Sequence, residues 1–194
     1  MKLENVLEFA QMLNAFRQVE RVVYVNGSDR LENDSEHSYH LAMLAWYIAD
    51  SGKLDLDKDL IIKYALVHDL VEVYAGDTYL YSEDREHRES KIDREHQALL
   101  RLKEEFPFCE DMFSIIDRYE KREDRESRFI YVLDKMQPII QIYLDDGRMW
   151  KEKNVTLQML FEKKKDKVAL SPEVRPYFDE LMALLKAEEK ELFD

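Results

Sequence analysis

The stretch IIKYALVHDLVEVYAGD, residues 61–77, decides the fold class of this chain. Its apolar side chains occur on all sides of a helix, and a helix that is apolar all round belongs at the centre of a helical protein. We expect one helix over about 57–75, capped at its start by Asp55 or Asp57. Gly76 then ends this helix.

The remainder of the chain repeats the helical pattern, because apolar residues recur mostly at spacings of three and four. Four Gly and four Pro in 194 residues are few, which favours long helices over turns. Residues 21–34 are predicted to form a loop, and no segment alternates cleanly enough to predict a strand. Further helices are expected at 3–19, about 35–50 (with Asp34 or Ser35 as N-cap), 84–106, 109–121, 125–145, 149–168 and 172–192. The predicted fold class is therefore all-α, a helical bundle.

Length and composition limit the organisation and the partners. The length fits one domain over residues 1–194, with the chemistry-bearing motifs within 32–134 and the helices of 149–194 packing on them. A net charge of −13 argues against a nucleic-acid polymer as partner, although a bound cation would still allow a small phosphate ester. The lone Cys109 excludes an internal disulfide and suits a reducing compartment. No membrane span or secretory signal is evident, so we expect a cytoplasmic protein.

Imidazole and carboxylate groups interrupt three apolar helices. His68 and Asp69 lie within the apolar helix of residues 61–77, and Glu72 follows one turn later. His37 is in register with the apolar face of the second helix, and Asp134 lies within FIYVLDKMQPIIQIY. Two imidazoles and two carboxylates on core helices form a plausible mixed nitrogen and oxygen site for a divalent metal. A metal there would lower the pKa of a bound water, which Glu72 would hold or deprotonate.

Each of these residues also has a structural interpretation. A core histidine such as His37 often just bonds to a carbonyl group, and a core Asp134 often pairs with a cation such as Lys135 or Arg128. The adjacent pair His68-Asp69 is open to both interpretations. Residue types and spacing alone therefore support a metal site only as a hypothesis.

The order of these residues adds a resemblance to a known family. The pattern His37, His68-Asp69, Asp134 resembles the H…HD…D signature of the HD-domain metal-dependent phosphohydrolase superfamily. The stretches ENDSEHS, residues 32–38, and HDLVEVYAGD, residues 68–77, are similar to motifs of the branch that contains bacterial 5′-deoxynucleotidase. In motif order the resemblance covers about residues 5–145.

The resemblance implies a reaction and the residues that carry it. Glu72 and Asp77 are implied to handle the attacking water and the sugar end of the substrate, and Arg21 is implied to meet the phosphate. The implied reaction is hydrolysis of a nucleoside 5′-monophosphate, preferably in its 2′-deoxy form, and a homodimer is common in this branch. One divalent ion (Mn, Co, Fe, Ni, Zn or Mg) is implied to be held by four side chains: His37, His68, Asp69 and Asp134.

Two departures from the family pattern lie where the sugar and base of the substrate would be recognised. Val22 follows Arg21, where the bacterial deoxynucleotidase has a tryptophan, and the residues 78–81 lack the proline of the family's turn. These departures leave the metal chemistry unchanged and put the nucleotide specificity in doubt. Another small phosphate ester, or a nucleoside triphosphate, is the alternative substrate, and a non-catalytic metal-containing binding module is the alternative function.

Three of the polar residues keep open alternatives. Arg21 is either the substrate contact or a surface charge paired with Glu20 or Glu36. Asp77 either contacts the substrate or merely follows the helix end. His40, three residues after His37, is either a group supporting the metal site or a partly buried histidine at a helix edge.

Overall fold

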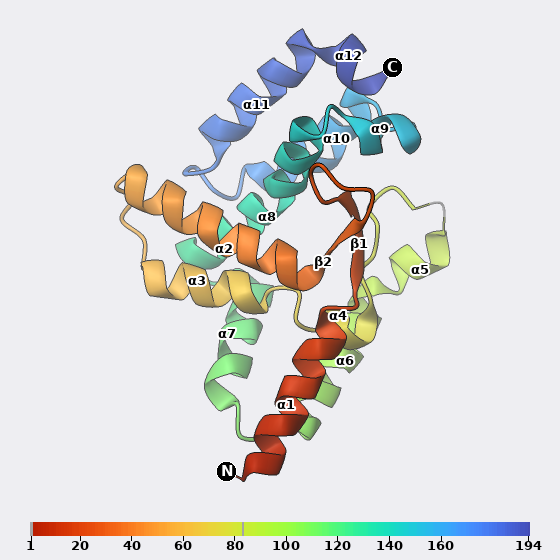
Figure 1. Ribbon diagram of the computed structural model, residues 1–194. Helices are drawn as coiled ribbons and strands as arrows, with labels where there is room; N and C mark the ends of the chain where they lie inside the picture. The colour runs from red at the N-terminus through yellow and green to blue at the C-terminus, as the bar shows by residue number, and fades with distance from the viewer. Residues whose placement is uncertain (1, 83) are drawn as a thin grey trace.

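The long helix α8 (Arg125–Leu144) lies at the centre of the protein in this computed structural model, which describes residues 2–82 and 84–194 (Figure 1). Its start is fixed by a capping box, in which Asp124 accepts a hydrogen bond from the Ser127 amide at 2.7 Å and Ser127 Oγ accepts from the Asp124 amide. Helices α2, α3, α7, α9, α10 and α11 all pack against it. The buried residues of α8 include apolar side chains on several of its faces, as expected of a central helix.

The elements follow one another mostly as helices. The only strands in the described residues are β1 (Glu20–Tyr24) and β2 (Leu31–Asn33). The other helices are α1 (Leu3–Phe16), α2 (Asp34–Ser51), α3 (Lys58–Val67), α4 (Glu72–Ala75), α5 (Arg85–Glu89), α6 (Lys91–Glu105), α7 (Glu110–Lys121), α9 (Arg148–Glu152), α10 (Leu157–Val168), α11 (Arg175–Ala187) and α12 (Glu189–Phe193). The predicted all-α class is confirmed. Within the described residues, no helix is long and apolar enough to cross a membrane.

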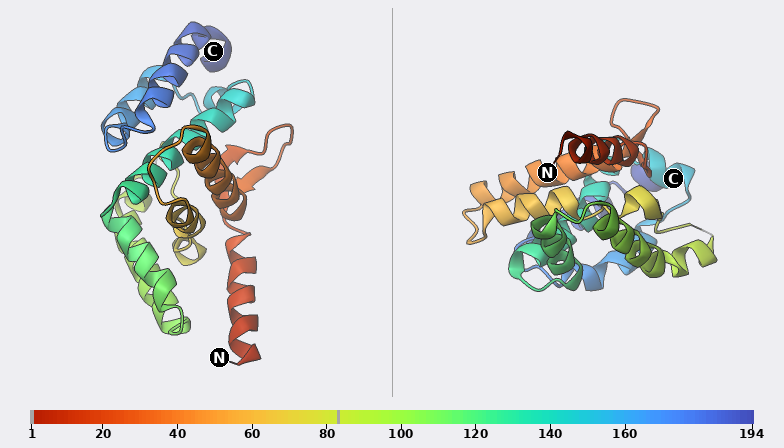
Figure 2. Two further views of the ribbon diagram at one scale, coloured as in Figure 1. Left: turned by 90° about the vertical axis from the view of Figure 1, so that its left-hand side faces the viewer. Right: turned by 90° about the horizontal axis from the view of Figure 1, so that it is seen from below.

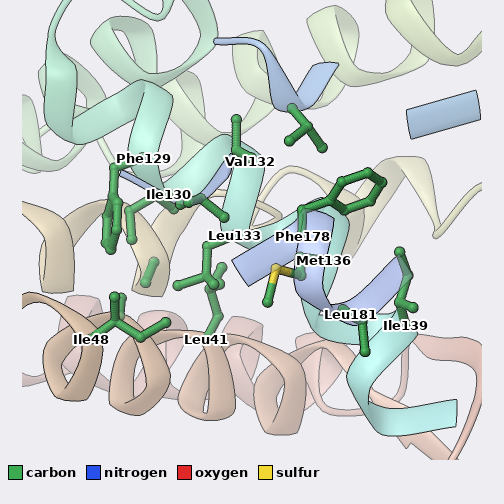
Figure 3. Close-up of a cluster of buried hydrophobic side chains, with 14 of the residues drawn as sticks. Leu41, Ile48, Phe129, Ile130, Val132, Leu133, Met136, Ile139, Phe178 and Leu181 are labelled. Carbon is green, nitrogen blue, oxygen red and sulfur yellow. The ribbon is translucent and has the colours of Figure 1, made fainter. Parts of the chain in front are cut away.

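The main hydrophobic core joins α2, α3 and α8 to the C-terminal helices. Leu41 of α2 and Leu133 of α8 are completely buried in it, and Figure 3 shows Phe178 and Leu181 of α11 beside Met136 of α8. A second core packs α1 against α4, α6 and α7. Helix α7 contributes buried residues to both cores. The two chain termini lie toward opposite ends of the molecule (Figures 1 and 2).

The loop predicted over residues 21–34 is wrong in part, because two short antiparallel strands form there. Glu20 pairs with Asn33, and Tyr24 pairs with Leu31. The run ERVVY is rich in β-branched and aromatic residues, which suit a pleated strand even without clean alternation. Gly27, at φ +73°, provides a left-handed residue in the connection between the strands. The hairpin fixes the position of Arg21.

The single helix predicted over 57–75 is also wrong, because it is broken at the His-Asp pair. Asp57 caps α3 as expected, accepting from the Leu60 amide at 3.1 Å, but α3 ends at Val67. The next residues form tighter bonds three residues apart, for example from the Glu72 amide to the Asp69 carbonyl at 2.8 Å. The helix then resumes as α4 and ends at Gly76, as predicted.

Other predicted boundaries shift for local reasons. The N-cap of α2 is Asn33, which accepts from the Glu36 amide at 3.0 Å, and neither Asp34 nor Ser35 has this role. The helix expected over 3–19 stops at Phe16. The helices expected over 84–106, 149–168 and 172–192 each divide in two, at Ser90, at residues 153–156 and at Glu188, and α11 begins only at Arg175. Position 83 lies outside the described residues.

Candidate metal centre and adjoining cavity

The four side chains predicted to bind metal converge from three parts of the fold. His37 comes from α2, His68 and Asp69 from the turn after α3, and Asp134 from α8. One ligand atom of each lies within 4.8 Å of those of the other three. His37 Nε2 is 3.0 Å from Asp134 Oδ1, and His68 Nε2 is 3.0 Å from Asp69 Oδ2. This spacing brings two nitrogen and two oxygen donors around one point.

The outer nitrogen of each imidazole is already engaged. His37 Nδ1 lies 2.9 Å from Gln137 Oε1, and His68 Nδ1 lies 2.9 Å from the Ala65 carbonyl oxygen. An oxygen of this kind only accepts, so each Nδ1 carries the proton and donates it. The Nε2 atom of each ring therefore points toward the carboxylates, with a lone pair in neutral His37 and, in the metal-free protein, a proton in charged His68 that a metal would replace.

An unsatisfied buried nitrogen shows that this donor set fits a divalent ion. His68 Nε2 is buried and has no hydrogen bond of acceptable geometry among the described residues. Buried polar atoms normally have a partner, and a metal would supply one here. Neutral imidazole and carboxylate are the ligands that divalent transition metals and zinc accept.

The charges around the four donors keep the carboxylates ionised. Burial favours a protonated Asp69, but positively charged His68 holds the pKa of Asp69 well below its usual value. Burial opposes ionisation of Asp134 too, and there Lys135, 2.6 Å away, holds its pKa low. Burial lowers the pKa of His37 to about 4, which keeps this ring neutral. Burial would also lower the pKa of His68, but Asp69 and Asp134 raise it to about 10, so a cation at this point is favoured.

Lys135 shows that the structural interpretation of Asp134 is also realised. The sequence left open whether Asp134 binds a metal or pairs with Lys135 or Arg128. Lys135 pairs with Asp134 Oδ2, while Arg128 donates to the Arg122 and Glu123 carbonyl groups. Asp134 Oδ1 still faces the histidines, so pairing and ligation use different oxygens.

Arg21 lies beside the four donors, held by acidic side chains. Its Nη1 is 2.9 Å from Asp69 Oδ2 and 3.1 Å from Asp34 Oδ1, and the side chain is 11% exposed. The alternative of a surface pair with Glu20 or Glu36 is wrong, because Glu36 pairs with Arg30 instead. Arg21 Nη2 makes no hydrogen bond to the described residues, so it is available to a ligand.

Asp34 is a buried site residue that sequence reasoning considered only as a helix cap. It is completely buried, and burial, followed by the charge of Asp69, raises its pKa to about 7. Asp34, Asp69 and Glu72 form a second group whose ligand atoms lie within 4.8 Å of one another. The acidic stretch ENDSE gave no sign of this burial.

Glu72 and Asp77 both line the cavity next to the four donors. Glu72 is 1% exposed, its Oε1 is 3.1 Å from Lys91 Nζ, and its Oε2 is buried without a hydrogen bond. Burial, followed by Asp69, raises the pKa of Glu72 to about 10. Asp77 follows Gly76, whose φ of +71° turns the chain after α4. Burial raises the pKa of Asp77, and Arg21 opposes this shift.

The cavity is about 280 Å³, large enough for part of a small ligand. Asp69 and Asp134 open onto it, and Val22, Tyr79 and Tyr81 also line it. The two tyrosine rings lie 5.6 Å apart in an edge-to-face arrangement. Six cationic side chains contribute to its wall: Arg21, Arg88, Lys91, Lys135, Lys164 and Lys167. The last two come from α10 and were not predicted as site residues.

His40 lies outside the group of four donors. Its side chain is 48% exposed, and its Nδ1 is 3.4 Å from Glu32 Oε1. Glu32 is completely buried and reaches to 3.8 Å from His37 Nδ1. His40 is thus at the helix edge and contacts the site only through Glu32.

Comparisons with known proteins agree with this geometry. The chain is 29% identical over 140 residues to the 5′-deoxynucleotidase HDDC2 of Bos taurus, a match that covers 71% of this chain and 66%, just under two thirds, of that relative. It is 28% identical over 198 residues to the protein of the same name from Dictyostelium discoideum, covering 97% of this chain and 100% of the relative.

A solved structure is similar over nearly the whole chain. It is described as a predicted metal-dependent phosphohydrolase from Magnetospirillum magnetotacticum, with a TM-score of 0.82, 25% identity, and coverage of 99% of this chain and 96% of the other. A conserved hypothetical protein from Pyrococcus furiosus, at 18% identity and a TM-score of 0.65, shares the fold. The sequence model of the HD-domain family matches residues 13–175, which include all four donors and α10, and the chain therefore belongs to the HD-domain family.

Proposed function

We propose that this protein is a metal-dependent phosphohydrolase that converts (deoxy)nucleoside 5′-monophosphates to nucleoside and phosphate. The observation that carries the proposal is a largely buried two-histidine, two-aspartate cluster opening onto a cavity lined by cationic side chains. The relatives named 5′-deoxynucleotidase support the substrate class.

The metal is proposed to be one divalent ion, held by four side chains: His37, His68, Asp69 and Asp134. When bound, this ion supplies a Lewis acid that lowers the pKa of water and polarises a phosphoryl oxygen. The neighbouring group of Asp34, Asp69 and Glu72 contains only carboxylates and shares Asp69 with this site. Elemental analysis of protein purified without added metal or chelator tests both the identity and the count, with one equivalent per chain expected.

The protein's own residues position the reaction around the phosphorus atom. Glu72, whose raised metal-free pKa a nearby divalent ion would lower, is proposed to orient the water, accept its proton as the water oxygen attacks phosphorus, and return that proton to the departing 5′ oxygen. Arg21 is proposed to neutralise a phosphate oxygen through the free side of its guanidinium. Asp77 is proposed to contact the sugar, and Tyr79 with Tyr81 provides an aromatic surface for the base.

The decisive experiment pairs a substrate panel with a Glu72→Gln variant. Phosphate release from deoxy and ribo 5′-monophosphates is measured with protein loaded with Mn, Co, Mg or Zn. Glu72→Gln is expected to keep its metal and its fold while activity falls about 10²–10⁴-fold. Glu95→Gln is the matched control, because Glu95 also pairs with Lys91, at 2.9 Å, but does not line the cavity.

The outcomes separate the alternatives. No release from any deoxynucleoside monophosphate would exclude the proposed substrate, and release from another phosphate ester or a triphosphate would identify the alternative one. Full activity in Glu72→Gln would remove Glu72 from the mechanism. If the wild type binds metal and hydrolyses nothing in the panel, the non-catalytic binding module is favoured.

The proposed homodimer is supported by an exposed apolar face on α2. Tyr39, Met43, Trp46 and Tyr47 are 46–69% exposed and recur at the spacing of one helix face. Large exposed apolar patches mark interaction sites. Light scattering with Trp46→Glu tests this, since a dimer that uses this face should dissociate. The single domain over 1–194, the cytoplasmic location and the absence of a nucleic-acid or membrane partner stay predictions.

A further inference from the structure

Helix α10 places a lysine at a position that the fold otherwise gives to apolar side chains. The buried residues of α10 are Leu157, Leu160, Lys164 and Val168, spaced three and four apart along one face. Lys164 is 8% exposed, whereas the neighbouring Lys163 and Lys165 are exposed. Lys164 therefore lies on the buried face of α10.

Lys164 also lacks an anionic partner for the ammonium group of its largely buried side chain. Of the cationic residues lining the cavity, Arg21, Lys91 and Lys135 have carboxylate partners. Lys164 has no hydrogen bond or ion pair with any residue in 2–82 or 84–194. A buried charge without a partner is unfavourable, and burial together with the charge of Lys135 lowers the pKa of Lys164 to about 7.

Lys164 and the proposed reaction centre share one cavity. Lys164 lines the cavity onto which Asp69 and Asp134 open. The charge of Asp134 raises its pKa, and the charge of Arg21 lowers it. Lys167, three residues further along α10, is half-buried, lines the same cavity and has no ion-pair partner among the described residues.

We propose that Lys164 is a further phosphate-binding residue, whose ammonium group donates to a nonbridging oxygen of the substrate phosphate while Lys167 adds a second positive charge. This rests on the proposed function in so far as a phosphate ester occupies the cavity. A lysine side chain is only a donor, so an acceptor-rich dianion satisfies it, whereas an uncharged nucleoside does not. A segment outside the HD motifs thus supplies part of the substrate site.

The alternative is that Lys164 merely packs its methylene stem against the core and places its ammonium group at the cavity edge. The two interpretations differ in phosphate affinity. We would titrate inorganic phosphate into the Mn-loaded full chain near neutral pH and follow heat release. Lys164→Met removes the charge and keeps the stem, and Lys165→Met is the matched control on the exposed face.

The dissociation constant for phosphate should rise at least about tenfold in Lys164→Met, since a charge-assisted hydrogen bond is lost. It should stay within about twofold of wild type in Lys165→Met, with the Mn content of both variants unchanged. Wild-type affinity in a folded, Mn-loaded Lys164→Met, or no phosphate binding by the wild type, would overturn the proposal. If Lys164→Met fails to fold, Lys164→Gln, which retains a polar tip, must show the same loss.

The phosphate titration does not depend on hydrolysis, so the phosphate contact and the proposed reaction can be refuted independently. Phosphate binding that depends on Lys164, in a protein that hydrolyses no 5′-monophosphate, would refute the proposed reaction and still support the phosphate contact. Hydrolysis with unchanged phosphate affinity and unchanged KM in Lys164→Met would refute the contact and leave the reaction standing.

Discussion

Replacing Gln137 by leucine tests whether the metal site depends on a residue that touches no metal. Gln137 is 4% exposed on α8, and its Oε1 accepts the hydrogen bond from His37 Nδ1 at 2.9 Å. This bond fixes the tautomer that leaves His37 Nε2 free to face Asp134 Oδ1, 3.0 Å away. In Gln137→Leu the ring loses its anchor while the volume at the site stays similar.

Gln137→Leu should lower both the metal affinity and the stability of the metal-free protein. Removing the partner of a metal-binding histidine costs roughly 10–100-fold in metal affinity, or about 1.4–2.7 kcal/mol. The completely buried His37 also keeps a donor without an acceptor, which costs about 1–3 kcal/mol of metal-free stability. Both the affinity and the free energy of unfolding should therefore fall.

The assay is a Mn titration by calorimetry together with urea unfolding of the metal-free protein. Gln141→Leu is the matched control, because it makes the same change one turn later on α8 at a half-buried position. It should bind Mn like the wild type. Wild-type Mn affinity in a folded Gln137→Leu would refute the inference that Gln137 orients His37, and an equal loss in both variants would point to a general effect on α8.

Three further outcomes are expected. Gly147→Ala should lower the free energy of unfolding in urea by about 2–4 kcal/mol, because the φ of Gly147 is +71° and a Cβ there would lie 2.1 Å from the Leu192 carbonyl oxygen. Gly27→Ala is the control: Gly27 has φ +73° but no atom within 4 Å of the added Cβ, so the loss should be only about 1–2 kcal/mol. Equal losses in the two variants would contradict the clash at Gly147. EDTA should lower the melting temperature of the wild type but not that of Asp134→Asn, and Mn should restore it; a shift in both would place the metal elsewhere. Burial lowers the pKa of Lys164 from 10.5 to about 7, so between these pH values the folded state binds fewer protons than the unfolded state. The free energy of unfolding of the wild type should therefore fall as the pH drops from 10.5 to about 7. Lys164→Met should lack this contribution, so its stability relative to the wild type should increase toward pH 7 and become constant below.

The residues of the candidate site can be recognised in the sequence because they are polar groups within otherwise apolar helices. An imidazole or carboxylate inside an apolar helix is expensive unless something pairs with it, so His68, Asp69 and Asp134 stand out from the residue pattern alone. The order of the motifs then indicates the protein family. The structure brings the four predicted donors together, and their role as ligands stays a prediction.

The parts that could not be predicted depend on the geometry of the backbone. A helical period carries no mark of the tighter turn after Val67, since apolar residues continue at Leu70, Val71 and Val73 beyond the His-Asp pair. The strands around Arg21 are too short for alternation to show. Lys164 sits within the run KKKDK, which looks like a solvated face, and only the packing of α10 on α8 distinguishes it from its neighbours.

The cavity wall explains how a chain with a net charge of −13 can hold a phosphate. An acidic protein repels a dianion on average, but six cationic side chains line the cavity against four carboxylates, a formal excess of two positive charges before any metal binds. A divalent ion doubles that excess. Because field lines concentrate in a cleft with low-dielectric walls, this local excess outweighs the distant acidic surface. The same excess is unfavourable in the empty protein, where Lys164 has no ion-pair partner among the described residues. The cavity is thus electrostatically unfavourable without an anion, and a phosphate dianion stabilises the folded state by neutralising a positive excess that the metal alone would increase.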